Sequence, residues 1–240
     1  MKTPKKIARM IQHLIELRKK LIQSLVSVGI VFVLLYPFSS QLFHQFALPL
    51  LEQLPHHQEL IAITLTGAFF GPIQFCLFLA FFISAPLILY QLWCFITPGL
   101  YQDERLIGKI LLIGSVLLFY LGVIFAYFFI FPTIMSFLTH IAPEGVLVTP
   151  DISAYLHFSL RLLLAFGLAF EVPIVVIFAV RTGIISRNVL KQKRRYVIVF
   201  NFVVGMLLTP DVASQVMLAL PMCLLFELGL WVSKLPLLAK

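Results

Sequence analysis

Two adjacent carboxylates, Asp103 and Glu104, lie in a short polar segment between two long apolar runs. The segment covers residues 95–105 and reads Phe-Ile-Thr-Pro-Gly-Leu-Tyr-Gln-Asp-Glu-Arg. A carboxylate can accept two parallel hydrogen bonds from one guanidinium group, a geometry that lysine does not offer. Acidic side chains in a segment of this kind predict a binding surface for a cationic partner.

A third carboxylate, Glu16, lies near the N-terminus among several cations. Taken alone, Glu16 and Glu104 also have structural explanations. Glu16 can form an i,i+4 pair with Lys20 on one helix face. Glu104 can be a first-turn residue that is stabilised at the N-terminus of the helix that follows.

The composition predicts an integral membrane protein. The chain has 240 residues, of which 61% are hydrophobic and 12% charged, and its mean hydropathy is +1.03. A soluble domain of this size cannot hide so much apolar surface. A chain that spans a membrane must satisfy its own backbone groups, and segments that are apolar on all faces favour helices over barrel strands. We therefore expect an all-α membrane protein that forms a single domain over residues 1–240.

Six spans are expected, at residues 21–43, 72–94, 110–131, 156–180, 196–208 and 212–232. Residues 1–20 form a basic amphipathic helix suited to an anionic membrane surface. Because this polar stretch precedes the first apolar run, a cleavable signal peptide is not expected. Prolines should kink spans one, two, four and six, at Pro37, Pro86, Pro173 and Pro221.

The distribution of lysine and arginine predicts the topology. The N-terminal segment holds seven, the second linker two, the fourth linker region six and the C-terminal tail two, whereas the other linkers hold none. The remaining one, Arg161, lies inside span four and is expected to reach the interface. The positive-inside rule then places both termini in the cytoplasm and supports an even number of spans.

The fifth span is unusually short. Its 13 residues, 196–208, reach about 20 Å, whereas the hydrocarbon core is about 30 Å thick. Span six begins with the polar residues Ser214 and Gln215. The turn at residues 209–211 should therefore lie below the outer headgroups, and the mismatch can be relieved by a thinner bilayer or by another protein. The alternative is that span five ends later than residue 208.

Glu171 is the main polar group expected inside the membrane. A carboxyl group there usually faces a cavity or a partner, and Pro173 removes a helical hydrogen bond beside it. Glu171 has two interpretations: it lines a polar notch at mid-depth of the membrane, or it is a protonated structural glutamate bonded to a neighbouring helix. Gln74 and Gln91 are expected to bridge helices, and Glu227, near Lys234, to reach the interface.

No motif in the sequence indicates an enzyme. The six histidines and three cysteines are not spaced for a metal site or a disulfide framework, and zinc-protease, serine-hydrolase and phosphate-loop motifs are missing. We expect no cofactor and no metal. The net charge of +8 follows membrane topology rather than nucleic-acid binding.

Four motifs, in order along almost the whole chain, resemble the TatC family of the twin-arginine translocase. The first is the string HLIELRKKL before span one, and the second is Phe95-x-x-Pro98-x-Leu100-x-x-x-Glu104. The third, in span four, covers residues 166–173, and the fourth, at the junction of spans five and six, covers residues 205–215. One departure is the single proline, Pro210, before Asp211, where the family often has two.

The resemblance implies a receptor with six spans, a glove-like concave fold and short fifth and sixth spans. By this resemblance, Glu16 and Glu104 bind the paired arginines of a signal peptide. Phe95, Leu100 and Arg105 shape the same surface. The implied role is to organise the export of folded proteins across the bacterial cytoplasmic membrane.

The resemblance also implies partners. Glu171 and Gln215 would line the concavity within the membrane. Met206 and Leu207 would lie where the single-span protein TatB docks, and TatA would join the same oligomeric complex. A different functional class, a proton-coupled secondary transporter that uses Glu171, is the alternative, although the two halves of the chain show no inverted repeat.

Overall fold

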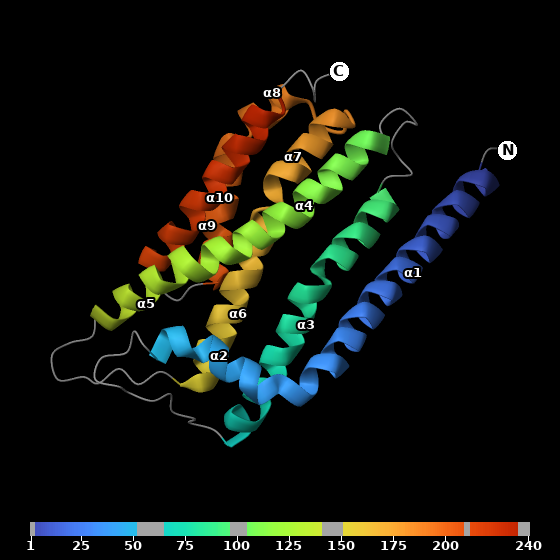
Figure 1. Cartoon of the computed structure of the whole chain (residues 1–240). Helices are drawn as coiled ribbons and strands as arrows, with labels where there is room; N and C mark the ends of the chain where they lie inside the picture. Colours follow the sequence, from blue (N-terminus) through green and yellow to red (C-terminus); the bar gives the residue numbers. More distant parts are fainter. Residues whose placement is uncertain (1–2, 52–64, 97–104, 141–150, 209–211, 235–240) are drawn as a thin grey trace. The chain divides into compact units, whose positions relative to one another are not determined.

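The structure, a computed structural model, describes residues 3–51, 65–96, 105–140, 151–208 and 212–234. All elements of regular structure in these ranges are helices, as expected from the composition (Figure 1). They are α1 (Thr3–Leu35), η1 (Tyr36–Phe38), α2 (Ser39–Leu51), α3 (Leu65–Ile96), α4 (Arg105–Phe125), η5 (Ala126–Ile130), α5 (Phe131–His140), α6 (Ile152–Ala169), α7 (Val172–Arg181), α8 (Arg187–Gln192), α9 (Arg194–Leu208) and α10 (Val212–Val232).

Five helical stretches are long and apolar enough to cross a membrane: Leu14–Phe46, Phe69–Phe95, Gly108–Ile134, Ser153–Arg181 and Gln215–Val232. They match expected spans one to four and six. The expected fifth span is α9, whose 15 residues reach about 23 Å, less than a hydrocarbon core of about 30 Å. The turn expected at residues 209–211 lies outside the described residues.

The first helix is longer than the sequence pattern suggests. The amphipathic segment and the first span form one uninterrupted helix of 33 residues, Thr3–Leu35. No proline falls between Pro4 and Pro37, so nothing in this stretch removes a backbone hydrogen bond. The chain bends at η1, which contains Pro37, and this confirms the expected break at that residue.

The chain forms two compact units, each described here by itself. Unit 1 comprises Met1–Ala47 and Pro72–Val116, and unit 2 comprises Leu48–Gly71 and Leu117–Lys240. In unit 1, Ser24 Oγ donates a hydrogen bond to Gln91 Oε1 at 2.5 Å, whereas the Phe46 and Phe75 rings lie 4.8 Å apart. Ser24 thus meets a late residue of α3, whereas Phe46, further along the chain, meets an early one. Helix α1 therefore runs antiparallel to α3 (Figure 1).

In unit 2, α10 packs against both α7 and α9. Gly229 permits the close approach of α10 to α7, because a Cβ atom there would lie 2.8 Å from Pro173 Cα. Val176, Phe226 and Leu230 form a buried cluster between these two helices. The glycine therefore brings the two backbones close enough for side chains on either side to interlock.

A second close crossing joins the end of α4 to α6. A Cβ atom on Gly122 would lie 2.6 Å from the Phe166 carbonyl oxygen and 2.9 Å from Phe170 Cβ. The Phe125 ring, one turn later, lies 5.9 Å from the ring of Phe166 and 5.7 Å from that of Phe170. A small residue and an aromatic cluster thus fix this crossing together.

Two spans are interrupted near their middle or end. The third changes from α-helix to π-helix at η5, Ala126–Ile130, an irregularity that the sequence pattern does not indicate. The fourth ends its first part at Ala169 and resumes at Val172, beside Pro173, as expected from the loss of one backbone donor. Glu171 therefore lies at a real break in the helix.

Candidate functional site

The residues predicted to bind a cationic signal belong to unit 1. Glu16 is exposed on α1, Phe95 is half-buried in the last turn of α3, and Arg105 begins α4. Leu100 and Glu104 lie outside the described residues, as does Asp103. The structure therefore describes one of the two predicted carboxylates and both ends of the segment that carries the other.

The contact between Ser24 and Gln91 allows the positions of Glu16 along α1 and of Phe95 along α3 to be compared. Phe95 lies four residues beyond Gln91, about 6 Å along α3, and Glu16 lies eight residues before Ser24, about 12 Å along α1. Because the two helices are antiparallel, both displacements point to the same end of unit 1 (Figure 1). Glu16 and the last turn of α3, which holds Phe95, are thus toward one end of this unit. The contact also confirms that Gln91 bridges two helices.

Glu171 occupies the break between α6 and α7 at the N-cap position of α7. Its side chain is half-buried, and its neighbour Phe170 is buried. The backbone is locally tightened, since the Glu171 N–H donates to the Leu168 carbonyl at 3.1 Å. The break gives a carboxyl group a position in the span where the regular helix is already interrupted.

Gln215 links the two helices of the hairpin formed by α9 and α10. Its Nε2 donates to the Phe202 carbonyl oxygen at 2.8 Å, and Gly205 makes room for it, because a Cβ atom there would lie 3.0 Å from Gln215 Cγ. A second polar link joins Asn201 Nδ2 to Cys223 Sγ at 3.4 Å. Asn201 is 4% exposed, and the sequence analysis missed it, although a lone amide in an apolar span is a recognisable signal.

Met206 and Leu207 lie near the end of α9 and are 67% and 75% exposed. Val199, Phe200 and Val203 on the same short helix are also exposed. An apolar helix face of this kind needs lipid or another protein to cover it. The described structure thus leaves both predicted docking residues available.

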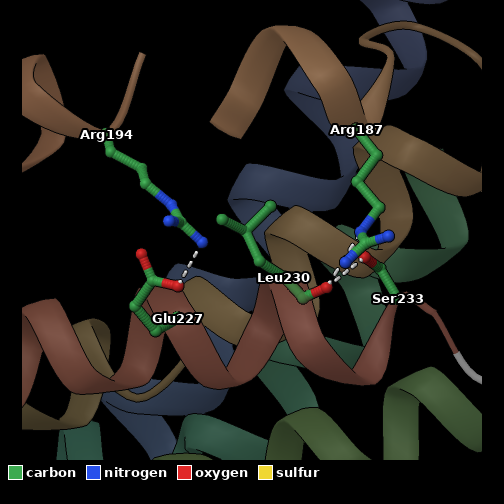
Figure 2. A network of polar contacts seen from close by, with 5 residues as sticks. All are labelled: Arg187, Arg194, Glu227, Leu230 and Ser233. Atoms are coloured by element: carbon green, nitrogen blue, oxygen red, sulfur yellow. Dashed lines mark hydrogen bonds and ion pairs between the residues drawn. The ribbon is translucent and has the colours of Figure 1, made fainter. Parts of the chain in front are cut away.

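The beginning of α9 is tied to the end of α10 by an ion pair. Arg194 Nη2 lies 2.7 Å from Glu227 Oε2, and each side chain is 47% exposed. Arg187 of α8 donates through Nε to the Leu230 carbonyl oxygen at 3.1 Å, as Figure 2 shows. Sequence proximity suggested Lys234 as the neighbour of Glu227, but the fold brings Arg194 to it from 33 residues away.

Comparison with known proteins identifies the chain's relatives. The family model described as "Sec-independent protein translocase protein (TatC)" matches residues 12–221. The protein of that name from Haemophilus influenzae is 50% identical over 226 residues, which are 94% of this chain and 88% of the relative. The Escherichia coli protein is 47% identical over the same shares. The Aquifex aeolicus protein is 40% identical over 93% of this chain and 94% of its own length.

Solved structures agree with these relatives. A crystal structure titled "Twin Arginine Translocase Receptor- TatC" superposes with a TM-score of 0.84 at 39% identity, covering 95% of this chain and all of that one. A second, of the same receptor in the detergent DDM, gives a TM-score of 0.85 at 40% identity over 93% of this chain. These matches support a translocase component in a membrane, with a role in transport rather than catalysis, and give no support to a secondary transporter. The chain belongs to the TatC family of Sec-independent protein translocase proteins.

Proposed function

We propose that this chain is the receptor subunit of a twin-arginine translocase and binds the paired arginines of signal peptides through Glu16 and Glu104. The observation that carries the proposal is that Glu16 lies toward the same end of unit 1 as Phe95 in the last turn of α3, and Glu104 follows Phe95 by nine residues in the sequence. If Glu104 lies beside Glu16, the two carboxylates suit two adjacent guanidinium groups. Phe95, Leu100 and Arg105 would shape the surface between them.

The chemistry favours arginine over lysine at this surface. A guanidinium group is planar and can donate two parallel hydrogen bonds to a carboxylate, whereas an ammonium group acts as a point charge. Lipid beside the site lowers the local dielectric constant and strengthens such pairs. The cations near Glu16, such as exposed Arg18 and Lys19, would repel a signal that lacks the correct register.

The proposal includes a location and a topology. The chain lies in the inner membrane of a bacterium, crosses it with six spans and has both termini in the cytoplasm. The lysine and arginine distribution supports this topology, and α9, the expected fifth span, would bring the number of crossings from five to six. A bilayer thinned around α9, or a partner packed on it, would accommodate the short helix. The whole chain, residues 1–240, then acts as one integral membrane domain with a glove-like concave face.

The proposal also assigns the remaining predicted residues. Glu171, at the break of span four, and Gln215, between α9 and α10, would line the concave face within the membrane. Met206 and Leu207 would receive the single span of TatB, and TatA would join the oligomeric complex during export. Their exposure on α9 supports this assignment.

The test is crosslinking of a photoreactive twin-arginine signal peptide to the full chain in native membranes. Glu104→Lys should reduce the crosslinked product at least about tenfold, because it converts an attraction into a repulsion worth more than 1.4 kcal/mol. Glu16→Lys should reduce it less, because neighbouring cations already weaken the field of this carboxylate. Asp103→Lys is the matched control, since it places the same charge one residue away.

Protein levels of all variants are equalised by immunoblot before comparison. If Glu104→Lys and Glu16→Lys both crosslink as well as the parent chain, the receptor assignment is wrong. A loss with Asp103→Lys as large as with Glu104→Lys would reduce the site to a general acidic surface.

A further inference from the structure

The end of unit 2 that carries α8 is strongly basic. Figure 1 shows that α7 and α10 both end there. Between residues 181 and 234, Glu227 is the one carboxylate among the residues that the structure describes. We call the following seven cations the basic end: Arg181, Arg187, Lys191, Lys193, Arg194, Arg195 and Lys234. The proposed signal-peptide site belongs to unit 1 and does not use them.

Four cations of the basic end already have partners in the described structure. Arg194 pairs with Glu227 at 2.7 Å, and Arg187 donates to the Leu230 carbonyl at 3.1 Å (Figure 2). These two contacts hold α8 and α9 against α10. The other two cations lie over one aromatic ring, that of Tyr196, with Lys193 at 4.8 Å and Arg195 at 5.0 Å from its centroid.

Arg181 differs from these four cations, because it has buried hydrogen-bond donors that meet no acceptor in the described part of the chain. Its Nε and Nη1 atoms are buried and meet no acceptor among the residues that the structure describes. A buried donor without an acceptor destabilises the folded state, and more so when it is charged. Within the same described ranges, Lys191 and Lys234 are exposed and pair with no carboxylate. Three cations are therefore available for an anion from outside the chain.

The positions of these cations indicate which kind of anion would bind to them. Arg181 is the last residue of the apolar stretch Ser153–Arg181, and Lys234 lies two residues after the end of the stretch Gln215–Val232. Both are at the level where the apolar part of a span gives way to headgroups. Val175 on α7 is 60% exposed and Trp231 on α10 is 62% exposed. Helices α7 and α10 thus carry exposed apolar side chains and have cations at or just beyond their ends, a combination that suits a molecule with both a phosphate and acyl chains.

We propose that the basic end binds an anionic phospholipid, whose phosphate is held by Arg181 and approached by Lys191 and Lys234. The guanidinium group turns from its covered position to donate to two phosphate oxygens, a geometry that arginine matches. The acyl chains lie along the exposed apolar side chains of α7 and α10. A cation near an anionic membrane surface contributes about fivefold in affinity, so three of them make the site selective.

The test uses Trp231 as a reporter in the full chain. The protein has two tryptophans, so Trp93→Phe leaves Trp231 alone, and the protein is reconstituted in symmetric phosphatidylcholine bilayers. A fixed mole fraction of lipid is then replaced by either dibrominated phosphatidylglycerol or dibrominated phosphatidylcholine, because bromine quenches nearby indole fluorescence. We expect the anionic lipid to quench as though its local fraction were at least about threefold its bulk fraction.

Two further chains separate this site from general attraction to charge. The triple variant Arg181→Gln, Lys191→Gln, Lys234→Gln should quench equally with both brominated lipids. The matched control removes three cations from α1 in unit 1 through Arg18→Gln, Lys19→Gln and Lys20→Gln, and should retain the preference. Circular dichroism and a thermal melt establish that each variant is folded. Inorganic phosphate at millimolar concentration should not abolish the preference, since it has no acyl chains.

Three results would overturn the proposal. Equal quenching by both lipids in the parent chain would mean that no anionic lipid is preferred there, as expected if an acidic protein segment is the occupant. A preference that survives the triple variant, or that is lost as strongly in the control, would place the site elsewhere. The measurement needs neither a signal peptide nor a defined sidedness, so its failure leaves the proposed receptor function intact.

Discussion

Helix α1 of unit 1 and the fourth span of unit 2 are both apolar, but they are buried to very different extents. The most apolar 18 residues of the stretch Leu14–Phe46 have 0% of their residues buried within the protein, against 50% for Ser153–Arg181. The fourth span is held by close glycine crossings and aromatic clusters. Helix α1 is joined to α3 by the hydrogen bond between Ser24 and Gln91.

This difference teaches which part of the chain can change and which part cannot. Side chains that are packed at a close helix crossing cannot be enlarged without moving backbone. Exposed apolar side chains of a spanning helix contact lipid. Replacing one of them by another apolar side chain therefore changes the stability of the fold little. Binding elements are commonly drawn from the less stable parts of a fold, and the proposed signal-peptide carboxylate Glu16 lies on α1.

The largest effect is expected where α4 crosses α6. Gly122→Ala places a Cβ atom 2.6 Å from the Phe166 carbonyl oxygen, so the helices must separate, and unfolding should become easier by about 1–3 kcal/mol. Thermal unfolding of the purified chain in detergent, followed by circular dichroism, measures this loss. Gly29→Ala on α1 is the matched control, because nothing lies within 4 Å of its added atom. If both variants melt like the parent chain, the proposed contrast between the two regions is wrong.

An intermediate effect is expected on partner binding by the exposed face of α9. Met206→Gln combined with Leu207→Gln should lower co-purification of a single-span TatB protein about tenfold, as expected for the loss of central apolar contacts. Leu25→Gln on α1 is the control, since Leu25 is 73% exposed and Leu207 75%. Quantitative immunoblots of the purified complex give the ratio. An equal loss in the control would mean that exposure alone, and not the α9 face, decides partner binding.

The smallest effect is expected at the contact that joins α1 to α3. Gln91→Leu removes the interhelical acceptor of the Ser24 hydroxyl and leaves it the Lys20 carbonyl oxygen at 3.0 Å within α1. Hydrogen bonds between spanning helices are worth about 0.6 kcal/mol on average. Amide hydrogen exchange in α1 should therefore become about threefold faster, while exchange in α10 should not change. Gln23→Leu, at an exposed position of α1, controls for the substitution itself. Unchanged exchange in α1 would show that this contact does not hold the helix.

Much of the fold could be predicted because the relevant signals are local in the sequence. Apolar run lengths located five stretches that are long and apolar enough to cross a membrane, and the short α9. Pro37 and Pro173 marked the two breaks, because each removes a backbone donor wherever it stands. The order of four motifs indicated the family that the comparisons then established. The carboxylate pair stays a prediction, since Glu104 lies outside the described residues.

Other features depend on which segments meet, and no local pattern contains that information. Glu227 pairs with Arg194 rather than with the nearer Lys234 because α9 folds back along α10. The buried Asn201 finds Cys223 for the same reason. The π-helical turn at Ala126–Ile130 contains no proline, so this signal of a helix irregularity is missing from its sequence.

The sequence by itself determined the membrane character, the helical class, the positions of the long apolar helices and the family of this protein. These properties follow from hydropathy, proline chemistry and motif order, each of which is written along the chain. The tertiary structure decided which cations are paired and which remain available, and which glycines are closely packed and which are open. Those outcomes depend on distances between residues far apart in sequence, which are set when the helices of each unit pack together.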